Sequence, residues 1–215
     1  MRSLKIIEDN YYHVYNRGNL KQTLFYDRSD YVRFLFLAMH MQSPVSLPQT
    51  NRFVKNYLKK EDFLVKNKDL DNIVSERFVE IINFCIMPNH FHLTVRTLSD
   101  DGLSRYMHKL SNAYSQYFNK RYEKSGHVFQ GAYKVKLVES DEQLTYLSAY
   151  IHRNPNELRR WKNNTISYPW SSYQDYLSNR WKKLLVGEVI TSTFGSFEEY
   201  QEFVENSGAK EDFEI

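Results

Sequence analysis

The chain has 215 residues, of which 41% are hydrophobic and 26% are charged, as in a globular domain with its own hydrophobic core. Its single cysteine, Cys85, excludes an internal disulfide and a zinc site built from several cysteines. No apolar run approaches the roughly 18 residues of a membrane span, and the first ten residues lack the apolar centre of a signal peptide. We therefore expect a cytoplasmic protein.

The net charge of +3 is unevenly distributed along the chain. Residues 196–215 hold seven acids and one base, whereas residues 104–136 hold seven bases and one acid. A basic segment of this kind either binds a polyanion or forms a solvated helix face, and its composition leaves both possibilities open.

The hydrophobic pattern predicts alternating strands and helices. In chain order they are a strand at 11–19, a helix at 29–41, strands at 78–89 and 90–97, a helix at 99–126, a strand at 127–138 and a helix at 140–155. The second and third strands can pair as a hairpin around Pro88. We expect a partly helical insertion outside the core at 43–75, and packing elements outside the core at 168–177 and 196–206. This order predicts an α+β fold, an antiparallel sheet covered by helices of the split βαβ kind.

Two histidines, His90 and His92, flank Phe91 in the stretch CIMPNHFHLTV. Successive side chains of a strand point to opposite faces, so the two imidazoles share one face. Either they are core histidines with hydrogen-bond partners, or a divalent metal binds both. A metal would need a further ligand from elsewhere in the chain.

The helix that begins at Ser140 offers such a ligand. Tyr150 and Asn154 are four residues apart and therefore lie on one helix face. A tyrosine hydroxyl beside a metal can act as a nucleophile, and an amide oxygen can complete the coordination. The alternatives are aromatic packing for Tyr150 and a helix cap for Asn154. The helix should end near Asn154, because a residue before proline is disfavoured in helical geometry.

Five motifs in one order carry a resemblance to a known family. They are YHVYNRGN near the start, MPNHFHL, GHVFQGAYK, YIHRNP and YPWSSY. Together, over about residues 10–180, they resemble the HUH-type single-tyrosine transposases of insertion sequences, and more closely the REP-associated tyrosine transposases. The resemblance implies a transposase domain at 1–180, with the insertion at 43–75, followed by an acidic helical extension at 181–215.

The resemblance also implies a ferredoxin-like domain that binds hairpins of single-stranded DNA and cleaves nearby. His90, His92 and Asn154 would hold Mg²⁺ or Mn²⁺, and Tyr150 would form a 5′-phosphotyrosine intermediate. Mobile-element members often carry glutamine where this chain has Asn154, which favours the REP-associated branch. We expect a monomer or homodimer that is associated with the nucleoid when bound. The expected DNA contacts are Arg17, Arg105, Lys109, Lys120, Arg121, Lys134, Lys136 and Arg153.

Two other functions remain open from the sequence. One is a domesticated hairpin-binding protein with little or no cleavage activity. The other is a metal-dependent nuclease that activates water and does not need Tyr150. Among the other tyrosines, Tyr146 is the main rival nucleophile, because it lies one turn before Tyr150 on the same helix face. Tyr114 and Tyr117 have the spacing of core residues.

Overall fold

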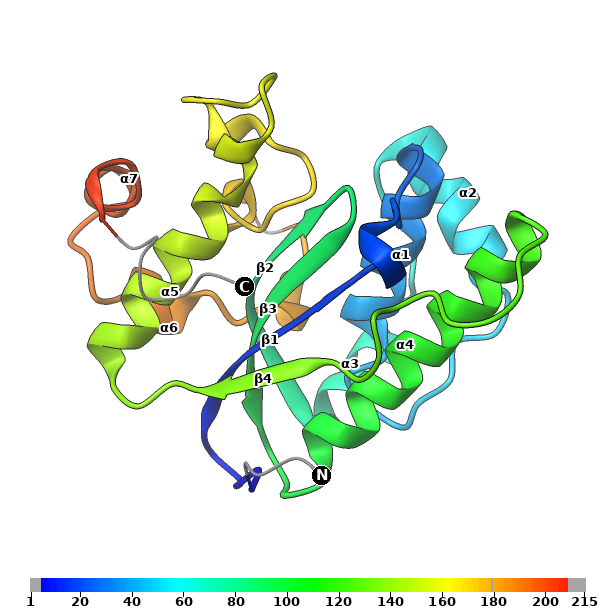
Figure 1. The fold of residues 1–215 in the computed structure, drawn as a ribbon. Coiled ribbons are helices and arrows are strands. Elements are labelled where there is room, and N and C mark those ends of the chain that lie inside the picture. Colours follow the sequence, from blue (N-terminus) through cyan, green and yellow to red (C-terminus); the bar gives the residue numbers. More distant parts are fainter. Residues whose placement is uncertain (1–4, 179, 209–215) are drawn as a thin grey trace.

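A four-stranded antiparallel sheet forms the centre of the computed structural model, which describes residues 5–178 and 180–208 (Figure 1). The strands are β1 (Tyr11–Arg17), β2 (Val79–Met87), β3 (His90–Thr97) and β4 (Lys134–Leu137), in the order β2-β3-β1-β4. The chain order strand, helix, strand, strand, helix, strand is that of the ferredoxin-like split βαβ unit. The predicted α+β fold class is therefore confirmed.

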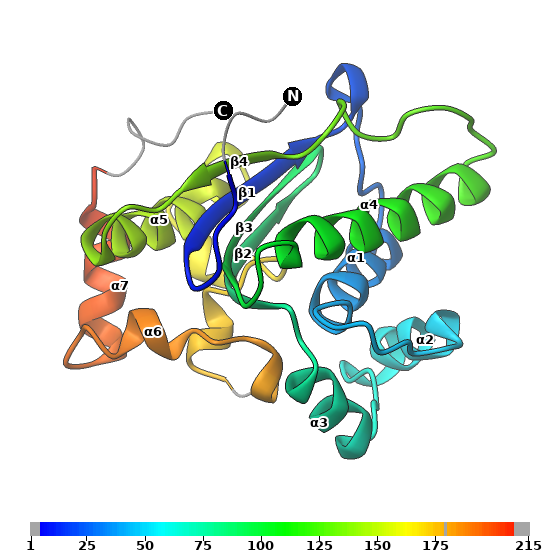
Figure 2. The same ribbon diagram turned by 90° about the horizontal axis from the view of Figure 1, so that it is seen from below.

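Helices cover both faces of this sheet (Figures 1 and 2). On one side lie α1 (Arg28–His40), α2 (Thr50–Lys60), α3 (Asn67–Ser75) and α4 (Gly102–Arg121). On the other lie α5 (Asp141–Arg153), α6 (Glu188–Thr191) and α7 (Phe197–Asn206). Short 3₁₀ helices occur at Asn19–Lys21, Asn154–Glu157, Thr165–Ser167, Gln174–Tyr176 and Lys182–Leu184. No helix in the described part of the chain is long and apolar enough to cross a membrane.

Each face of the sheet has its own hydrophobic core, because strand side chains alternate between the faces. Phe91, Leu93 and Val95 of β3 pack beneath α1 and α4. On the opposite face, residues of β2 such as Cys85 and Met87 pack beneath α5. The candidate site lies on this second face.

The insertion at 43–75 is partly helical as predicted, but the prediction that it lies outside the core is wrong. Phe53, Tyr57 and Ile73 are buried in the same cluster as α1 and α4. The ring of Phe53 stacks on Phe36 of α1 with centroids 5.1 Å apart. The lysines that suggested a surface segment occupy the outer face of an amphipathic helix.

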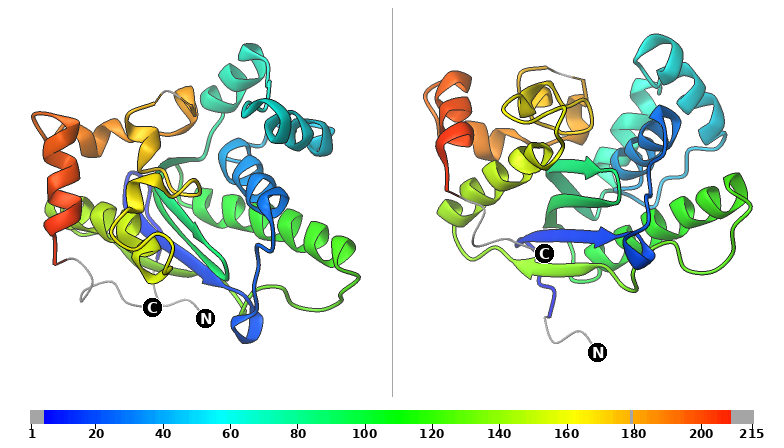
Figure 3. Two further views of the ribbon diagram at one scale, coloured as in Figure 1. Left: turned by 90° about the horizontal axis from the view of Figure 1, so that it is seen from above. Right: turned by 45° about the horizontal axis from the view of Figure 1, so that its top comes forward.

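Residues 168–177 were also expected outside the core, and they instead cover the free edge of β2 (Figure 3). The backbone N–H of Ser172 donates to the carbonyl of Phe84 at 3.0 Å, and that of Ile86 donates to Trp170 at 2.9 Å. Tyr168 and Tyr173 are buried in the α5 core. This segment satisfies backbone groups that an exposed edge strand would leave unpaired. Tyr200 and Val204 are buried in the same core, so the prediction that 196–206 lies outside the core is also wrong.

The last strand is shorter than predicted. Only Lys134–Leu137 pairs as β4, whereas the prediction spanned 127–138. Gly131 adopts a left-handed conformation with φ of +73°, and the N–H of Gln130 donates to the carbonyl of Arg17. A turn there interrupts the alternation that the sequence pattern suggested.

Candidate functional site

The sheet face beneath α5 carries an unusual number of polar side chains. His13 and Arg17 of β1 lie on it with His90 and His92 of β3, since the two strands pair antiparallel in register. On β4, Lys136 pairs with His13 and Lys134 pairs with Tyr15, so both lysines lie on this face as well.

His90 and His92 point to one place, as the strand alternation predicts. Their ring centroids are 5.2 Å apart, and the side chains are 6% and 0% exposed. His90 Nδ1 lies 2.7 Å from Asn89 Oδ1, and His92 Nδ1 lies 2.9 Å from His13 Nε2. The other nitrogen of His92, Nε2, is buried without a hydrogen-bond partner.

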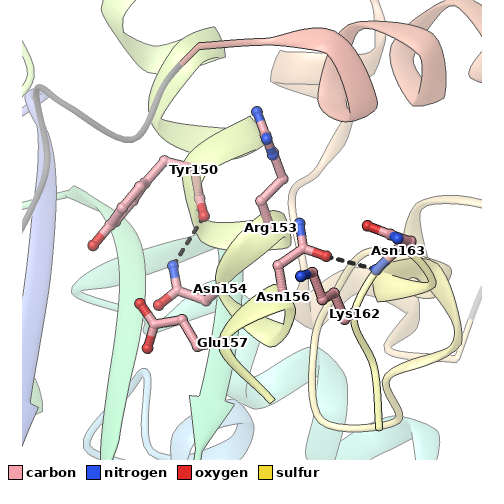
Figure 4. Close-up of a pocket in the computed structure, with 7 residues that line it drawn as sticks. All are labelled: Tyr150, Arg153, Asn154, Asn156, Glu157, Lys162 and Asn163. Carbon is pink, nitrogen blue, oxygen red and sulfur yellow. Dashed lines mark hydrogen bonds between the residues drawn. The ribbon is translucent and has the colours of Figure 1, made fainter. Parts of the chain in front are cut away.

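Helix α5 brings Tyr150 and Asn154 to the same place. The Tyr150 ring stands edge-on to His92 with centroids 5.5 Å apart. Asn154 donates from Nδ2 to the carbonyl of Tyr150 at 2.9 Å, and its side chain also hydrogen-bonds to His90. Figure 4 shows the Tyr150 hydroxyl and the Asn154 amide oxygen pointing towards the sheet.

The sequence of α5 explains this placement. Ser140 caps the helix by accepting from the backbone N–H of Gln143 at 3.1 Å. The α-helix ends at Arg153 as predicted, but the predicted reason is wrong. Asn154 keeps helical angles, with φ of −48° and ψ of −39°, and the chain continues as a 3₁₀ turn. Pro155 ends the α-helix because it has no N–H to donate.

The histidines of the site are uncharged at neutral pH. Burial lowers the pKa of His90 to about 4, with a further contribution from Arg17, and the Asn154 hydrogen bond opposes this shift. Burial, followed by His13, His90 and Arg17, lowers the pKa of His92 well below its usual value. Burial and then Lys136 lower the pKa of His13 to about 3. Neutral imidazole is the form that binds metals.

The donor set of this site is two imidazoles and one amide. Within residues 5–178 and 180–208, no three His, Cys, Asp or Glu side chains are arranged to hold a metal. His90, His92 and Asn154 nevertheless fit a divalent cation that takes its remaining ligands from water or phosphate, as Mg²⁺ usually does. The buried, unpartnered Nε2 of His92 is the observation that supports this fit.

A pocket of about 280 Å³ adjoins the nucleophile candidate (Figure 4). Its lining residues come from the end of α5 and the loop that follows, and they are Tyr150, Arg153, Asn154, Asn156, Glu157, Lys162 and Asn163. The cations Arg153 and Lys162 could contact a phosphate, and the asparagine amides could hydrogen-bond to the sugar or base of a nucleotide beside Tyr150.

The structure divides the eight basic residues expected to contact DNA into two groups. Arg17, Lys134, Lys136 and Arg153 surround the histidine face or the pocket. Arg105, Lys109, Lys120 and Arg121 lie on α4, on the opposite side of the sheet (Figure 2).

Three of the α4 residues already have partners within the protein. Arg121 pairs with Asp27 at 2.5 Å and with the buried Asp30 at 2.8 Å. Lys109 donates to the carbonyl of Ser43 at 2.5 Å, and the Arg105 guanidinium stacks on Phe78. Their role in DNA binding remains a prediction.

The rival tyrosines lie elsewhere. Tyr114 is fully buried and donates to the carbonyl of Leu24 at 2.7 Å, while Tyr117 donates to Asp30. Tyr146 is 39% exposed and packs against Phe203 of α7. Of these four tyrosines, Tyr150 alone packs against His92.

Sequence reasoning missed His13 and Asn89, which contact the two histidines. The alternation in YYHVYNR does place His13 on one strand face with Tyr11 and Tyr15. It does not reveal that β1 and β3 are neighbours, and the contact joins residues 79 positions apart.

Comparisons with known proteins bear on the fold and on the family that this chain resembles. Residues 50–154 match the family model described as "Transposase IS200 like", a range that includes the histidine pair, Tyr150 and Asn154. No curated protein matches the chain. A solved structure of a REP-associated tyrosine transposase bound to a REP hairpin has the same fold, with a TM-score of 0.53 and 13% identity over 88% of this chain and 92% of that one. The resemblance indicated by the motifs is thus confirmed, and residues 50–154 of the chain are similar to the IS200-like transposases.

Proposed function

We propose that the protein cleaves and rejoins single-stranded DNA beside a hairpin, through a covalent bond between Tyr150 and the DNA. The observation that carries this proposal is the convergence of Tyr150 and Asn154 from α5 on His90 and His92 of β3. The hairpin as partner is supported by the solved structure of similar fold, which is described as bound to a REP hairpin.

The site chemistry follows from these four residues. When bound by His90, His92 and Asn154, Mg²⁺ or Mn²⁺ would withdraw charge from the oxygens of the scissile phosphate. The Tyr150 oxygen then forms a bond to phosphorus and loses its proton, while the bond from phosphorus to the 3′ oxygen breaks and that oxygen takes up a proton. The products are a 5′-phosphotyrosine and a free 3′-hydroxyl.

The covalent bond explains how one site can both cut and join. The phosphotyrosine retains the energy of the phosphodiester, so a second 3′-hydroxyl can attack it and rejoin strands without ATP. Tyr150 is released unchanged.

Cations near the site would guide the strand into it. Lys134 and Lys136 are exposed on the face that carries the histidines, and Arg153 and Lys162 line the adjoining pocket. Contacts of this kind neutralise phosphates without reading sequence.

The test is whether DNA becomes attached to Tyr150. The DNA flanking the gene is searched for inverted repeats, and a hairpin made from such a repeat is incubated with the protein and Mn²⁺. We expect a protein–DNA adduct whose nucleotide maps to Tyr150 by mass spectrometry. Tyr150→Phe should retain hairpin binding but form no adduct, whereas the matched control Tyr146→Phe should still form one.

Variants of the ligands separate this proposal from its alternatives. His90→Ala and His92→Ala should lose cleavage and keep hairpin binding, and a chelator should have the same effect until Mn²⁺ is restored. Cleavage that survives in Tyr150→Phe would indicate a nuclease that uses water. Hairpin binding without cleavage by the wild type under any metal would indicate a domesticated binding protein.

A further inference from the structure

Both histidines of the site are hydrogen-bonded through the same ring atom. His90 Nδ1 contacts Asn89 Oδ1 at 2.7 Å, and His92 Nδ1 contacts His13 Nε2 at 2.9 Å. A neutral imidazole carries one proton, and the nitrogen that carries it cannot bind a metal. The partners of the two Nδ1 atoms therefore decide whether Nε2 is available.

The direction of the first hydrogen bond follows from the surroundings of Asn89. Its Nδ2 donates to the carbonyl of Lys21 at 3.4 Å, so the amide turns Oδ1 towards His90. Its own carbonyl accepts from the N–H of Gly18 at 2.8 Å, which fixes the backbone of the turn. An amide oxygen only accepts, so this hydrogen bond places the proton of His90 on Nδ1, whereas the hydrogen bond between His90 and the Asn154 side chain competes for that proton in the metal-free chain.

The second hydrogen bond has two possible directions. If His13 donates, His92 carries its proton on Nε2, and if His92 donates, His13 carries its proton on Nδ1. If His92 donates, its Nε2 keeps a lone pair that a cation can use. The two rings stack with centroids 5.1 Å apart and planes 16° apart, and the 1% exposed His13 has little room to turn.

We propose that Asn89 and His13 are positioning residues that hold the protons of His90 and His92 on Nδ1, so that both Nε2 atoms face one divalent cation. This role rests on the proposed function, because it presupposes the cation. Outer partners that fix a ligating histidine in this way typically change metal affinity by about 10- to 100-fold when they are removed.

Mn²⁺ binding to the full chain tests the role without DNA or cleavage. Free Mn²⁺ is titrated by electron paramagnetic resonance. His13→Phe and Asn89→Leu remove the acceptor while keeping a similar volume, and both should weaken Mn²⁺ binding by about 10- to 100-fold. His13→Gln and Asn89→Asp keep an acceptor oxygen and should restore most of the affinity. The control His40→Phe changes a buried histidine of α1 and should have no effect.

Nitrogen-15 spectroscopy of the metal-free wild type reads the protons directly and does not depend on any variant folding. We expect both histidines to carry the proton on Nδ1, and we expect His92 to lose that preference in His13→Phe. A proton on Nε2 of His92 in the wild type would overturn the proposal, as would an unchanged Mn²⁺ affinity in His13→Phe. Absence of Mn²⁺ binding by the wild type would instead overturn the proposed metal chemistry, and the positioning role with it.

Discussion

A buried chain of hydrogen bonds connects α5 to the C-terminal helix α7, and breaking it should lower the free energy of unfolding by a predictable amount. The Tyr200 hydroxyl of α7 contacts His152 Nδ1 at 2.7 Å and also bonds to Ser148, both on α5. His152 Nε2 continues to Ser172 Oγ at 2.8 Å, and Ser172 donates to the carbonyl of Phe84 in β2. All four side chains are fully buried.

The directions of these bonds determine what Tyr200→Phe would leave unpaired. Ser172 uses its proton on the carbonyl of Phe84, so it accepts from His152 Nε2, and His152 Nδ1 must accept from Tyr200. Without the hydroxyl, Ser148 can turn its proton to Tyr176, whose own hydroxyl donates to the carbonyl of Ile82, whereas His152 Nδ1 becomes a buried acceptor with no donor. A buried polar group left unpaired costs about 1–3 kcal/mol.

The assay is urea unfolding of wild type, Tyr200→Phe and Tyr146→Phe, followed by circular dichroism. We expect Tyr200→Phe to lower the free energy of unfolding by about 1–3 kcal/mol. Tyr146→Phe makes the same chemical change on the partly exposed face of α5 and should stay within about 0.5 kcal/mol of wild type. Equal stability of the two variants would refute the hydrogen-bond chain.

Two further predictions concern acid and DNA. His13 and His152 have a pKa lowered to about 3, and His40 and His90 to about 4, all by burial, so only the unfolded chain takes up these protons as the pH falls below about 6.5. Urea unfolding of the metal-free protein should therefore give the highest free energy of unfolding above that pH. Between pH 6.5 and pH 4 this free energy should fall by up to about 1.4 kcal/mol per pH unit for each histidine. A free energy of unfolding that does not change with pH would contradict this. Lys134→Gln with Lys136→Gln should weaken hairpin binding and reduce the slope of log affinity against log salt by about 1.4 in fluorescence anisotropy, because two phosphate contacts are lost. The control Lys59→Gln with Lys60→Gln on α2 should change neither the hairpin affinity nor the salt slope. An equal loss of affinity in this control would mean that Lys134 and Lys136 have no special role in binding the hairpin.

Local patterns predicted the elements on which the site is built. The alternation around Phe91 depends only on strand geometry, so it correctly places His90 and His92 on one face. Likewise the four-residue spacing of Tyr150 and Asn154 holds in any helix. These pairs needed no knowledge of the rest of the fold.

Features that depend on which elements become neighbours were not predictable in this way. The basic residues of α4 count towards the charge of the segment whichever way their side chains point. The sequence does not show that Arg121 forms an ion pair with Asp30 of α1. The many lysines of the insertion suggested a surface segment, although Phe53 and Tyr57 of the same helix are buried. The contact of His13 with His92 arises only when β1 and β3 pair.

The position of Tyr150 depends on residues well beyond the split βαβ unit. Every residue of α5 from Leu147 to His152 is buried, and six consecutive residues of a helix point to all sides, so this part of α5 needs partners on more than one side. The sheet provides one partner, and α7 with the segment around Tyr173 provides the other. Because Tyr150 lies on α5 and Asn154 directly follows its last residue, the two side chains move together when this packing changes. The C-terminal extension is therefore part of what holds Tyr150 against the two histidines.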